Sequence, residues 1–413
     1  MSSVKAKGGQ IFPKWHGNFP KLVLTPRNVV EVYSAFDFSL DQRLRIVPMG
    51  QCSRINWLEA IDTPFISLKS SLFKKVVNFN RSNMSIEVES GYTLVDLDNF
   101  LQTYGLFFPL DPFDYKDLTV GGAYSTNAFG GLSAYYGTMQ DLVIGVEVVT
   151  PSKKRIHFGA HVWKNVSGYD LRRFLIGSHG EFGFITKLIF KVFPRPLCVC
   201  KILAKGKDEK SIGDLIFLVL NRSVRAGSIC IFASSLDAKI AKKGLLPTFS
   251  LSFMDSFDLS YMLVGRFEEQ LKALSSLVEL EKIKMPFSMQ DNSVVEVCNI
   301  ISSSSGYLFF ISFNPDDCLY CIRFLSSLNI YGYLLYPRSG AGFFRVYFED
   351  DAVLSDFQRR LVSCSGLKVR PLITDENLRA SLSYKPGSAL LGVLKGIKHI
   401  FDPSDVCGRG LYS

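Results

Sequence analysis

Several features that would reveal a function at once are scarce or absent in this sequence. Its longest apolar runs, such as Leu215–Leu220 and Tyr307–Phe313, are far shorter than the ~20 residues that a membrane-spanning helix needs. Any membrane contact is therefore expected to be peripheral. The nine cysteines are an odd number, and residues 1–18 have no apolar core that could act as a secretory signal. We therefore expect reduced thiols and a cytoplasmic location.

Residues that would bind a metal are also sparse. Cys318 and Cys321 have the spacing of half a zinc or iron–sulfur site, but no second pair lies nearby and their neighbours are apolar, which favours buried thiols. His157 and His161 are four residues apart, but Gly159 and strand-like surroundings argue against a helical metal pair, so we interpret both as structural. The five histidines are His16, His157, His161, His179 and His399.

Charge and length set broad limits. The net charge of +9 is spread over the chain and not gathered in a tail, so a basic soluble surface is the simplest interpretation and nucleic acid is not indicated. Such a surface would also attract an anionic membrane face or an acidic ligand such as a dinucleotide or a carboxylate. With 413 residues, of which 47% are hydrophobic, two or three domains are expected.

The first candidate site is a turn that follows a predicted strand at 44–47. Gly50, Cys52 and Ser53 are small, so main-chain amides in this turn can approach a ligand closely, and Arg54 adds positive charge. An anion could bind here. Taken alone, the pattern fits an ordinary tight turn at least as well.

The densest stretch of small residues is 120–131, with four glycines among its twelve positions. Its backbone can press against something flat or charged. A P-loop is excluded because no Gly-Lys-Ser/Thr follows, and the dinucleotide pattern Gly-x-Gly-x-x-Gly is absent here. Apolar flanks argue against a flexible linker, whereas a glycine-rich hairpin remains an alternative.

The predicted elements divide the chain at a double proline, Pro194-Arg195-Pro196. Before it we expect a short helix at 26–36, a strand at 85–90, a helix from Thr93 to Tyr104, and a hairpin of strands 141–150 and 155–159. After it, short strands at 227–233, 307–313 and 343–348 alternate with helices at 268–280 and 317–328, which is typical of an α+β domain with an antiparallel sheet. An amphipathic helix is expected at 390–401.

The glycine-punctuated segments resemble, in order, the flavin-binding domain of the vanillyl-alcohol-oxidase/PCMH superfamily. Within it, residues 158–196 are most similar to the smaller FAD-binding (E) subunits of bacterial glycolate oxidases. The resemblance is specific over 45–196, weak but collinear over the second domain, and visible again at 394–412. The segments that carry it are 119–122, the glycines through Gly131, Tyr136-Gly137, 141–145, Phe158-Gly159, 164–171 and 177–186.

This resemblance implies an α+β fold: a two-lobed PCMH-type FAD-binding domain at 1–196, a cap domain with an antiparallel sheet at 197–370, and a segment at 371–413 that returns to the FAD domain. The residues that match FAD-binding positions are Gly50, Gln51, Cys52, Ser53 and Arg54 in the first pyrophosphate loop, Leu118, Gly121, Gly122, Thr126 and Asn127 in the second, and Gly183 and Ile185 in the adenine-side turn.

The chain also departs from the family pattern. The closing Asn-Pro-Gly-Arg of the family appears here as residues 408–411, Gly-Arg-Gly-Leu, and His179 stands where a glutamate is common. The first loop keeps only one of the glycines common elsewhere. Nothing in that loop matches the flavin-linking histidine of some relatives, so noncovalent FAD is implied.

The implied function is that of an FAD-binding oxidoreductase subunit in a glycolate-oxidase-like complex, which converts a small 2-hydroxy acid such as glycolate to glyoxylate. A catalytic flavoprotein subunit and an iron–sulfur subunit are the implied partners, and this chain would dock them and relay electrons. The complex would be cytoplasmic, with peripheral contact to the inner membrane left open.

Oxidation of a 2-hydroxy acid needs a base for the hydroxyl proton and a cation for the carboxylate. None of the histidines falls in the second domain, where the larger catalytic paralogue carries its cluster. Arg338 and Arg345, which flank residues 339–342, are the candidate carboxylate binders, and solvated hairpin arginines are an equal alternative. Two other functions stay open: a self-sufficient D-lactate-like dehydrogenase and a scaffold that has lost FAD.

Overall fold

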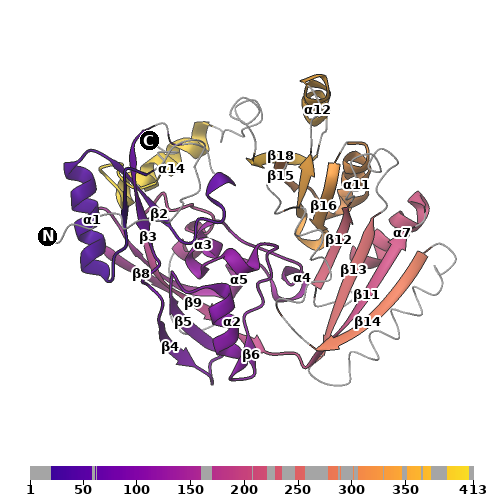
Figure 1. The fold of residues 1–413 in the computed structure, drawn as a ribbon, viewed down its shortest axis with the longest axis horizontal. Helices are drawn as coiled ribbons and strands as arrows, with labels where there is room; N and C mark the ends of the chain where they lie inside the picture. The colour runs from indigo at the N-terminus through magenta and orange to yellow at the C-terminus, as the bar shows by residue number, and fades with distance from the viewer. Residues whose placement is uncertain are drawn as a thin grey trace.

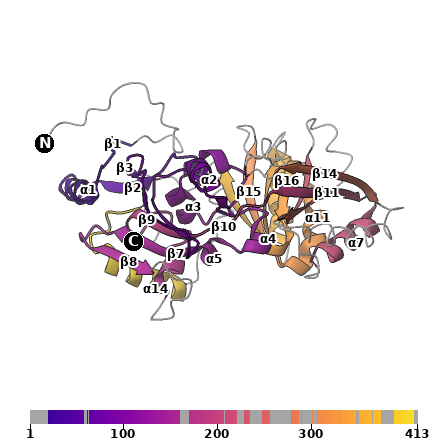
Figure 2. The same ribbon diagram turned by 90° about the horizontal axis from the view of Figure 1, so that it is seen from below.

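The computed structural model describes residues 20–57, 61, 63–159, 170–206, 208–220, 228–234, 247–255, 278–286, 289, 301, 306–328, 330–346, 351–363, 366–373 and 388–408. Two domains lie side by side along the long axis, with α4 (Ser133–Tyr136) at their junction (Figure 2). Across the part of the chain that these ranges cover, no helix has both the length and the apolar character needed to cross a bilayer.

The first domain has two lobes, each built on its own sheet. The smaller lobe has a parallel sheet in the order β1-β3-β2, and the larger lobe has an antiparallel sheet in the order β4-β5-β9-β7-β8. A short antiparallel pair, β6 with β10, lies where the chain leaves the first domain. The strands are β1 (Leu22–Leu24), β2 (Arg45–Met49), β3 (Phe65–Lys69), β4 (Val76–Asn80), β5 (Ser85–Glu89), β6 (Leu106–Phe107), β7 (Val143–Val149), β8 (Arg155–Gly159), β9 (Phe184–Lys191) and β10 (Phe193–Pro194).

The two longest helices of this domain begin at side chains that accept main-chain hydrogen bonds. Asn28 accepts from the amide of Glu31, and Thr93 accepts from the amide of Asp96, each at 3.0 Å, which satisfies a donor that a helix otherwise leaves unpaired. The remaining helices are short. The helices are α1 (Val29–Asp41), α2 (Leu94–Gln102), α3 (Val120–Ser125), α4, α5 (Met139–Leu142) and α6 (Leu171–Phe174), with 3₁₀ turns at Ile55–Trp57 and Tyr115–Asp117.

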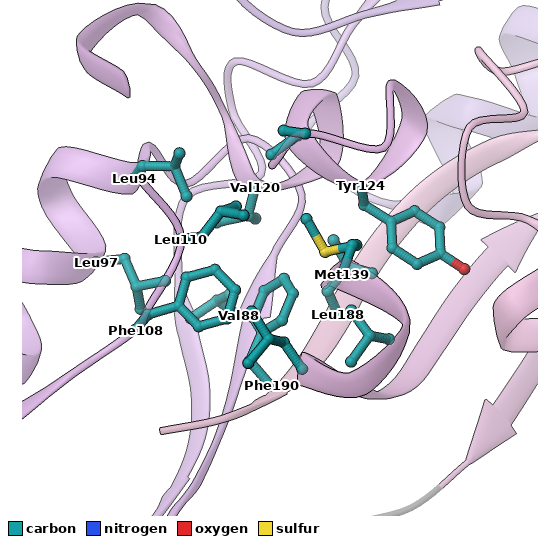
Figure 3. Packing of buried hydrophobic residues seen from close by; sticks show 14 of the residues in the cluster. Val88, Leu94, Leu97, Phe108, Leu110, Val120, Tyr124, Met139, Leu188 and Phe190 are labelled. Atoms are coloured by element: carbon teal, nitrogen blue, oxygen red, sulfur yellow. The ribbon is translucent and has the colours of Figure 1, made fainter. Parts of the chain in front are cut away.

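The core of the larger lobe lies between its sheet and α2, α3 and α5. Figure 3 shows Val120 and Tyr124 of α3 and Met139 of α5 near Leu188 and Phe190 of β9, and all five belong to one buried cluster. Burial of apolar surface on this scale is the main force that fixes α3 against the sheet. The short helix therefore has a defined position although its sequence is rich in glycine.

The second domain is an eight-stranded antiparallel sheet in the order β14-β11-β13-β12-β16-β17-β15-β18 (Figure 1). Helices α7, α11 and α12 contribute Ile212, Phe324 and Phe357 to the core on one face of that sheet. The elements are β11 (Cys198–Gly206), α7 (Glu209–Leu220), β12 (Ser228–Ser234), β13 (Thr248–Asp255), β14 (Val278–Pro286), β15 (Tyr307–Ser312), α11 (Cys318–Ser326), β16 (Ile330–Tyr336), β17 (Ala341–Val346), α12 (Asp351–Ser363) and β18 (Lys368–Ile373), with 3₁₀ turns at Pro315–Asp317 and Pro337–Ser339.

The opposite face of the cap sheet packs on the first domain through aromatic rings. Phe129 stacks on Phe343 of β17, with ring centroids 5.5 Å apart, and Phe113 meets the same ring edge-on at 4.7 Å. Trp57 lies beside both Phe113 and Phe343. Because aromatic pairs of this geometry add to the burial of their own surface, the two domains are held together by an apolar contact.

The chain then returns to the first domain through α14 (Ser388–Phe401), drawn in yellow in Figure 1. Beyond the helix, the amide of Ile46 in β2 donates to Val406 O and the amide of Gly408 donates to Ile46 O, both at 2.8 Å. Residues 406–408 thus lie beside β2 as a short parallel bridge. The proposed domain divisions are 1–196, 197–370 and 371–413, and β18, which ends at Ile373, crosses the second boundary.

The expected α+β class is confirmed, with a two-lobed first domain and an antiparallel sheet in the second domain. So are Thr93 as a helix cap, the pairing of β7 with β8, and the burial of Cys318 and Cys321. Burial raises the pKa of Cys318 to about 12.

The alternative of a glycine-rich hairpin at 120–131 does not hold, because the stretch begins with a helix, α3, which Thr119 caps. Two local expectations were wrong. The predicted strand 141–150 loses its first two residues to α5, which Thr138 and Asp141 cap reciprocally. Residues 278–280, predicted to end a helix, open β14, because they pair with β11; the rest of that predicted helix lies outside the described residues.

Candidate functional site

Three segments of the first domain line one cavity that is open to solvent. The first segment follows β2, the second surrounds the start of α3, and the third precedes β9. The wall is formed by Val47, Pro48, Met49, Gly50, Gln51, Cys52, Ser53, Arg54, Ile55, Ser70, Ser90, Leu118, Thr119, Gly121, Gly122, Ser125, Thr126, His179, Gly180, Gly183, Phe184 and Ile185.

The first and second segments touch at Gly50. A Cβ atom built on Gly50 would lie only 2.4 Å from Oγ1 of Thr119, so no larger residue fits without moving one segment. The same Oγ1 accepts a hydrogen bond from the amide of Gly122 at 3.0 Å. The two small-residue segments that the sequence singles out therefore converge because each lacks a side chain at the contact.

The side chain of Arg54 links these segments, and its partners are protein groups that the sequence did not predict. Its guanidinium makes two hydrogen bonds to the carboxylate of Asp114, at 2.6 and 2.5 Å, and donates to Oγ1 of Thr126 at 2.8 Å. It also lies 4.4 Å from the ring centroid of Trp57. The cation predicted for an anionic ligand is thus neutralised by a buried carboxylate, and Arg54 holds the cavity wall in place.

The third segment is attached to the second by main-chain hydrogen bonds. The amide of His179 donates to Ser125 O at 2.9 Å, and the amide of Gly177 donates to Tyr124 O at 3.1 Å. His179 has a positive φ of 53°, and Gly183 has a φ of 148°. A Cβ on Gly183 would meet Val149 O at 2.6 Å, so this turn requires glycine.

The amides of the α3 glycines donate to protein oxygens and not to an open diphosphate position. Gly121 N donates to Ser90 O at 2.9 Å, and Gly122 N donates to Thr119 Oγ1. Both amides are therefore hydrogen-bonded within the protein. What the glycines supply is space, since a Cβ on Gly122 would have only Thr119 and Leu118 within 4 Å.

Cys52 lies on the cavity wall in a left-handed conformation, with a φ of 65°. Its Sγ is 3.6 Å from Sδ of Met49 and 3.9 Å from Gly50 O. Burial raises the pKa of the Cys52 thiol, and the positive charge of Lys69 lowers it by a smaller amount. The thiol is therefore mostly protonated at neutral pH.

Eleven of the twelve residues that the sequence predicted for FAD lie on this wall: Gly50, Gln51, Cys52, Ser53, Arg54, Leu118, Gly121, Gly122, Thr126, Gly183 and Ile185. Asn127 is not among the residues that line it. Asn127 follows α3 with a φ of 49°, which asparagine tolerates better than most residues, so its place is the end of the helix.

The two candidate arginines of the cap do not line the cavity either. Arg345 is fully buried in β17, where its guanidinium donates to the carbonyl oxygens of Ile301 and Gly306. Burial lowers its pKa to about 10. Arg338 is half-buried in the 3₁₀ turn Pro337–Ser339, beside the contact of Ser339 with Ser133 of α4. Neither position faces the described cavity wall.

Sequence reasoning missed several wall residues, among them Ser70, Ser90, Thr119, Ser125 and Gly180. Thr119 carried a usable signal, because a threonine before an apolar helix start is a common cap. Ser90 followed a recognised strand but had no motif of its own. The matched motif positions Lys164–Tyr169 and Arg409–Leu411, together with His16 and His161, lie outside the described residues.

The wall residues fit a dinucleotide on three structural grounds. Small side chains leave room for a long ligand, and Ser90 presents a buried hydroxyl whose Oγ has no hydrogen-bond partner in the described part of the protein. The cavity also joins the two lobes, as an extended cofactor requires. Residues 20–159 match the family model of the FAD binding domain (FAD_binding_4). These residues form an FAD-binding domain. The expectation of FAD as the cofactor is confirmed.

Three curated proteins illustrate what this FAD-binding chain is similar to. It is 34% identical over 175 residues to the mitochondrial D-lactate dehydrogenase (cytochrome) of Arabidopsis thaliana, which covers 42% of this chain and 30% of that protein. It is 34% identical over 162 residues to glycolate oxidase subunit GlcE of Escherichia coli (39% and 46%) and 31% identical over 203 residues to subunit GlcD of Bacillus subtilis (48% and 43%). The chain spans less than half the length of each of these relatives.

Among solved structures, an alkyldihydroxyacetonephosphate synthase has a similar fold, with a TM-score of 0.65 at 14% sequence identity. The match covers 93% of this chain and 76% of that one. It therefore extends over both the FAD-binding domain and the cap. At this identity the similarity concerns the fold alone.

Proposed function

We propose that this chain is the FAD-binding subunit of a complex that oxidises small 2-hydroxy acids, with glycolate to glyoxylate as the reaction. FAD is held noncovalently in the cavity between the two lobes. A paralogous catalytic flavoprotein subunit and an iron–sulfur subunit are the partners. The complex is cytoplasmic, and any membrane contact is peripheral.

The convergence of three segments on one cavity inside an FAD-binding domain carries this proposal. The similarity to GlcE and GlcD supports the assignment to a glycolate oxidase. The proposed cofactor residues are the eleven wall residues named above. Bound FAD would supply the acceptor for the hydride that leaves the α-carbon of the acid.

The chain's own residues explain why a partner would perform the oxidation. In the described wall, the ionisable side chains are Cys52, Arg54 and His179. Arg54 is already paired with Asp114, and burial keeps the thiol of Cys52 protonated. Neither is suited to take the hydroxyl proton or to bind a substrate carboxylate. His179 is the remaining ionisable side chain of the described wall, and no unpaired cation for a substrate carboxylate accompanies it there, so the wall lacks the combination of groups that the oxidation needs.

A second function is favoured by the similarity to D-lactate dehydrogenases, in which case the chain would oxidise its substrate unaided. To separate the two, the chain is purified alone and, through a tag on the same chain, together with its natural partners. Each sample is mixed anaerobically with glycolate or D-lactate while the flavin absorption band is recorded.

The proposal expects that the band is bleached in the complex and persists in the isolated chain. Bleaching of the isolated chain by D-lactate would establish the self-sufficient dehydrogenase instead. Colourless material in both samples would favour a scaffold without FAD.

A further inference from the structure

Ser90 lines the cavity and carries a buried hydroxyl that nothing in the described protein engages. The residue follows β5 directly, is 1% exposed, and lines the cavity wall. Its Oγ is buried and has no hydrogen-bond partner in the part of the chain that the structure describes. Buried hydroxyls are normally paired, because an unpaired one loses its hydrogen bonds to water without replacement.

The backbone fixes the place of this hydroxyl. The amide of Ser90 donates to Thr186 O, and its carbonyl accepts from the amide of Gly121, both at 2.9 Å. A Cβ on Gly121 would lie 2.8 Å from Cβ of Ser90, so α3 is packed directly on the serine. The side chain is therefore held on the wall by its neighbours on both sides.

These neighbours also place Ser90 within the proposed binding site. Gly121 belongs to the segment assigned to the diphosphate, and Thr186 follows Ile185 of the segment assigned to the adenine side. Ser90 bridges the two. A ligand that runs from one segment to the other passes this residue.

We propose that Ser90 Oγ donates a hydrogen bond to the adenylate half of FAD, at an oxygen of its phosphate or ribose. This bond would strengthen the binding of FAD and leave that of FMN, which lacks that half, unchanged. This inference rests on the assignment of the cavity to FAD. A serine hydroxyl is an O–H donor, and O–H···O hydrogen bonds to such oxygens are common in proteins.

The test compares the wild-type chain with the Ser90→Ala variant, both freed of flavin. Dissociation constants for FAD, ADP and FMN are measured by calorimetric titration. Ser90→Ala is expected to weaken FAD and ADP about 10-fold and to leave FMN unchanged, since one hydrogen bond to the adenylate is lost. Thermal unfolding of the flavin-free variant is expected at the wild-type temperature or above it, because the deleted oxygen had no partner.

Ser39→Ala is the matched control. Ser39 is equally buried but lies in α1, away from the cavity wall, and its Oγ donates to Leu44 O. This variant should lose stability and keep its affinity for FAD and ADP.

Equal affinities of wild type and Ser90→Ala for FAD and ADP would overturn the role of Ser90, as would an equal loss for FMN. Failure of the wild-type chain to bind either FAD or ADP would instead overturn the assignment of the cavity, and the inference with it.

Discussion

Nζ of Lys398 lies 2.7 Å from Oδ2 of Asp402, and the two side chains are 3% and 0% exposed. The same Nζ donates to the carbonyl oxygens of Glu181 and Cys407, each at 2.6 Å. Oδ2 of Asp402 also accepts from the amide of Cys407 at 2.7 Å. One buried ion pair therefore attaches the C-terminal segment to the turn that contributes Gly180 to the cavity wall.

Replacing Lys398 by methionine should lower the free energy of unfolding by about 3–5 kcal/mol, because Asp402 would remain as a buried charge without its partner. Urea unfolding followed by circular dichroism measures the loss. Lys395→Met, on the exposed side of α14, is the control and should change stability by no more than ~0.5 kcal/mol. Equal stability of the two variants would mean that the ion pair does not anchor this segment.

In the pair of Arg54 and Asp114, removal of one partner should likewise destabilise the protein more than removal of both charges. Arg54→Met leaves a nearly buried carboxylate unpaired and is expected to lower the free energy of unfolding by about 3 kcal/mol or more. The double variant Arg54→Met/Asp114→Asn should recover part of that loss, since no buried charge remains. A double-mutant cycle measures the coupling. Additive losses would show that the two side chains do not interact in solution.

Neighbouring glycines in α3 should respond differently to alanine. A Cβ on Gly121 would meet Ser90 at 2.8 Å, so Gly121→Ala is expected to destabilise the fold by about 1–3 kcal/mol through overpacking. In Gly122→Ala the added Cβ would lie 3.1 Å from Thr119 Oγ1, a milder contact with one side-chain atom, so stability should change by no more than ~1 kcal/mol, since alanine favours helix. Its methyl group would enter the cavity, so FAD affinity should fall. Thermal unfolding and an FAD titration of both variants test this; unchanged FAD affinity in Gly122→Ala would remove Gly122 from the site.

Asp111 should make stability depend on pH. Desolvation raises its pKa to about 7, and its Oδ1 accepts from the amide of Leu132 next to the cap. The folded state then binds more protons than the unfolded state between about pH 4 and pH 7, so this group makes the protein less stable as pH rises through that range.

Asp111→Asn should remove this dependence and stabilise the protein at pH 8 relative to pH 5 by on the order of 1–3 kcal/mol, the carboxyl being half-buried. Urea unfolding at the two pH values is the measurement. Asp117→Asn, an exposed carboxyl on the same loop, is the control. The same pH profile for Asp111→Asn and wild type would contradict the raised pKa.

Local signals account for the parts of the fold that were predicted. Thr93 as a cap and the alternation at 85–90 depend on neighbours a few residues apart, so the sequence shows them directly. The helix α3 was not predicted, because glycine has a low helix propensity. The burial of Val120 and Tyr124 on β9 outweighs that low propensity.

The candidate site was predicted as a set of segments, but not in its interactions. The pairing of Arg54 with Asp114 joins residues 60 positions apart, and Arg345 donates to carbonyls of a segment 44 positions away. Such contacts depend on how distant elements pack, which no local pattern encodes. The orphaned hydroxyl of Ser90 is likewise visible only once the cavity exists.

Whether the cavity between the two lobes holds FAD is measured by an equilibrium titration of the flavin-free chain with FAD. We expect saturable binding of one FAD per chain, release of the whole flavin on denaturation, and competition by ADP. Absence of saturable FAD binding by the folded chain, with circular dichroism showing it intact, would contradict the central claim.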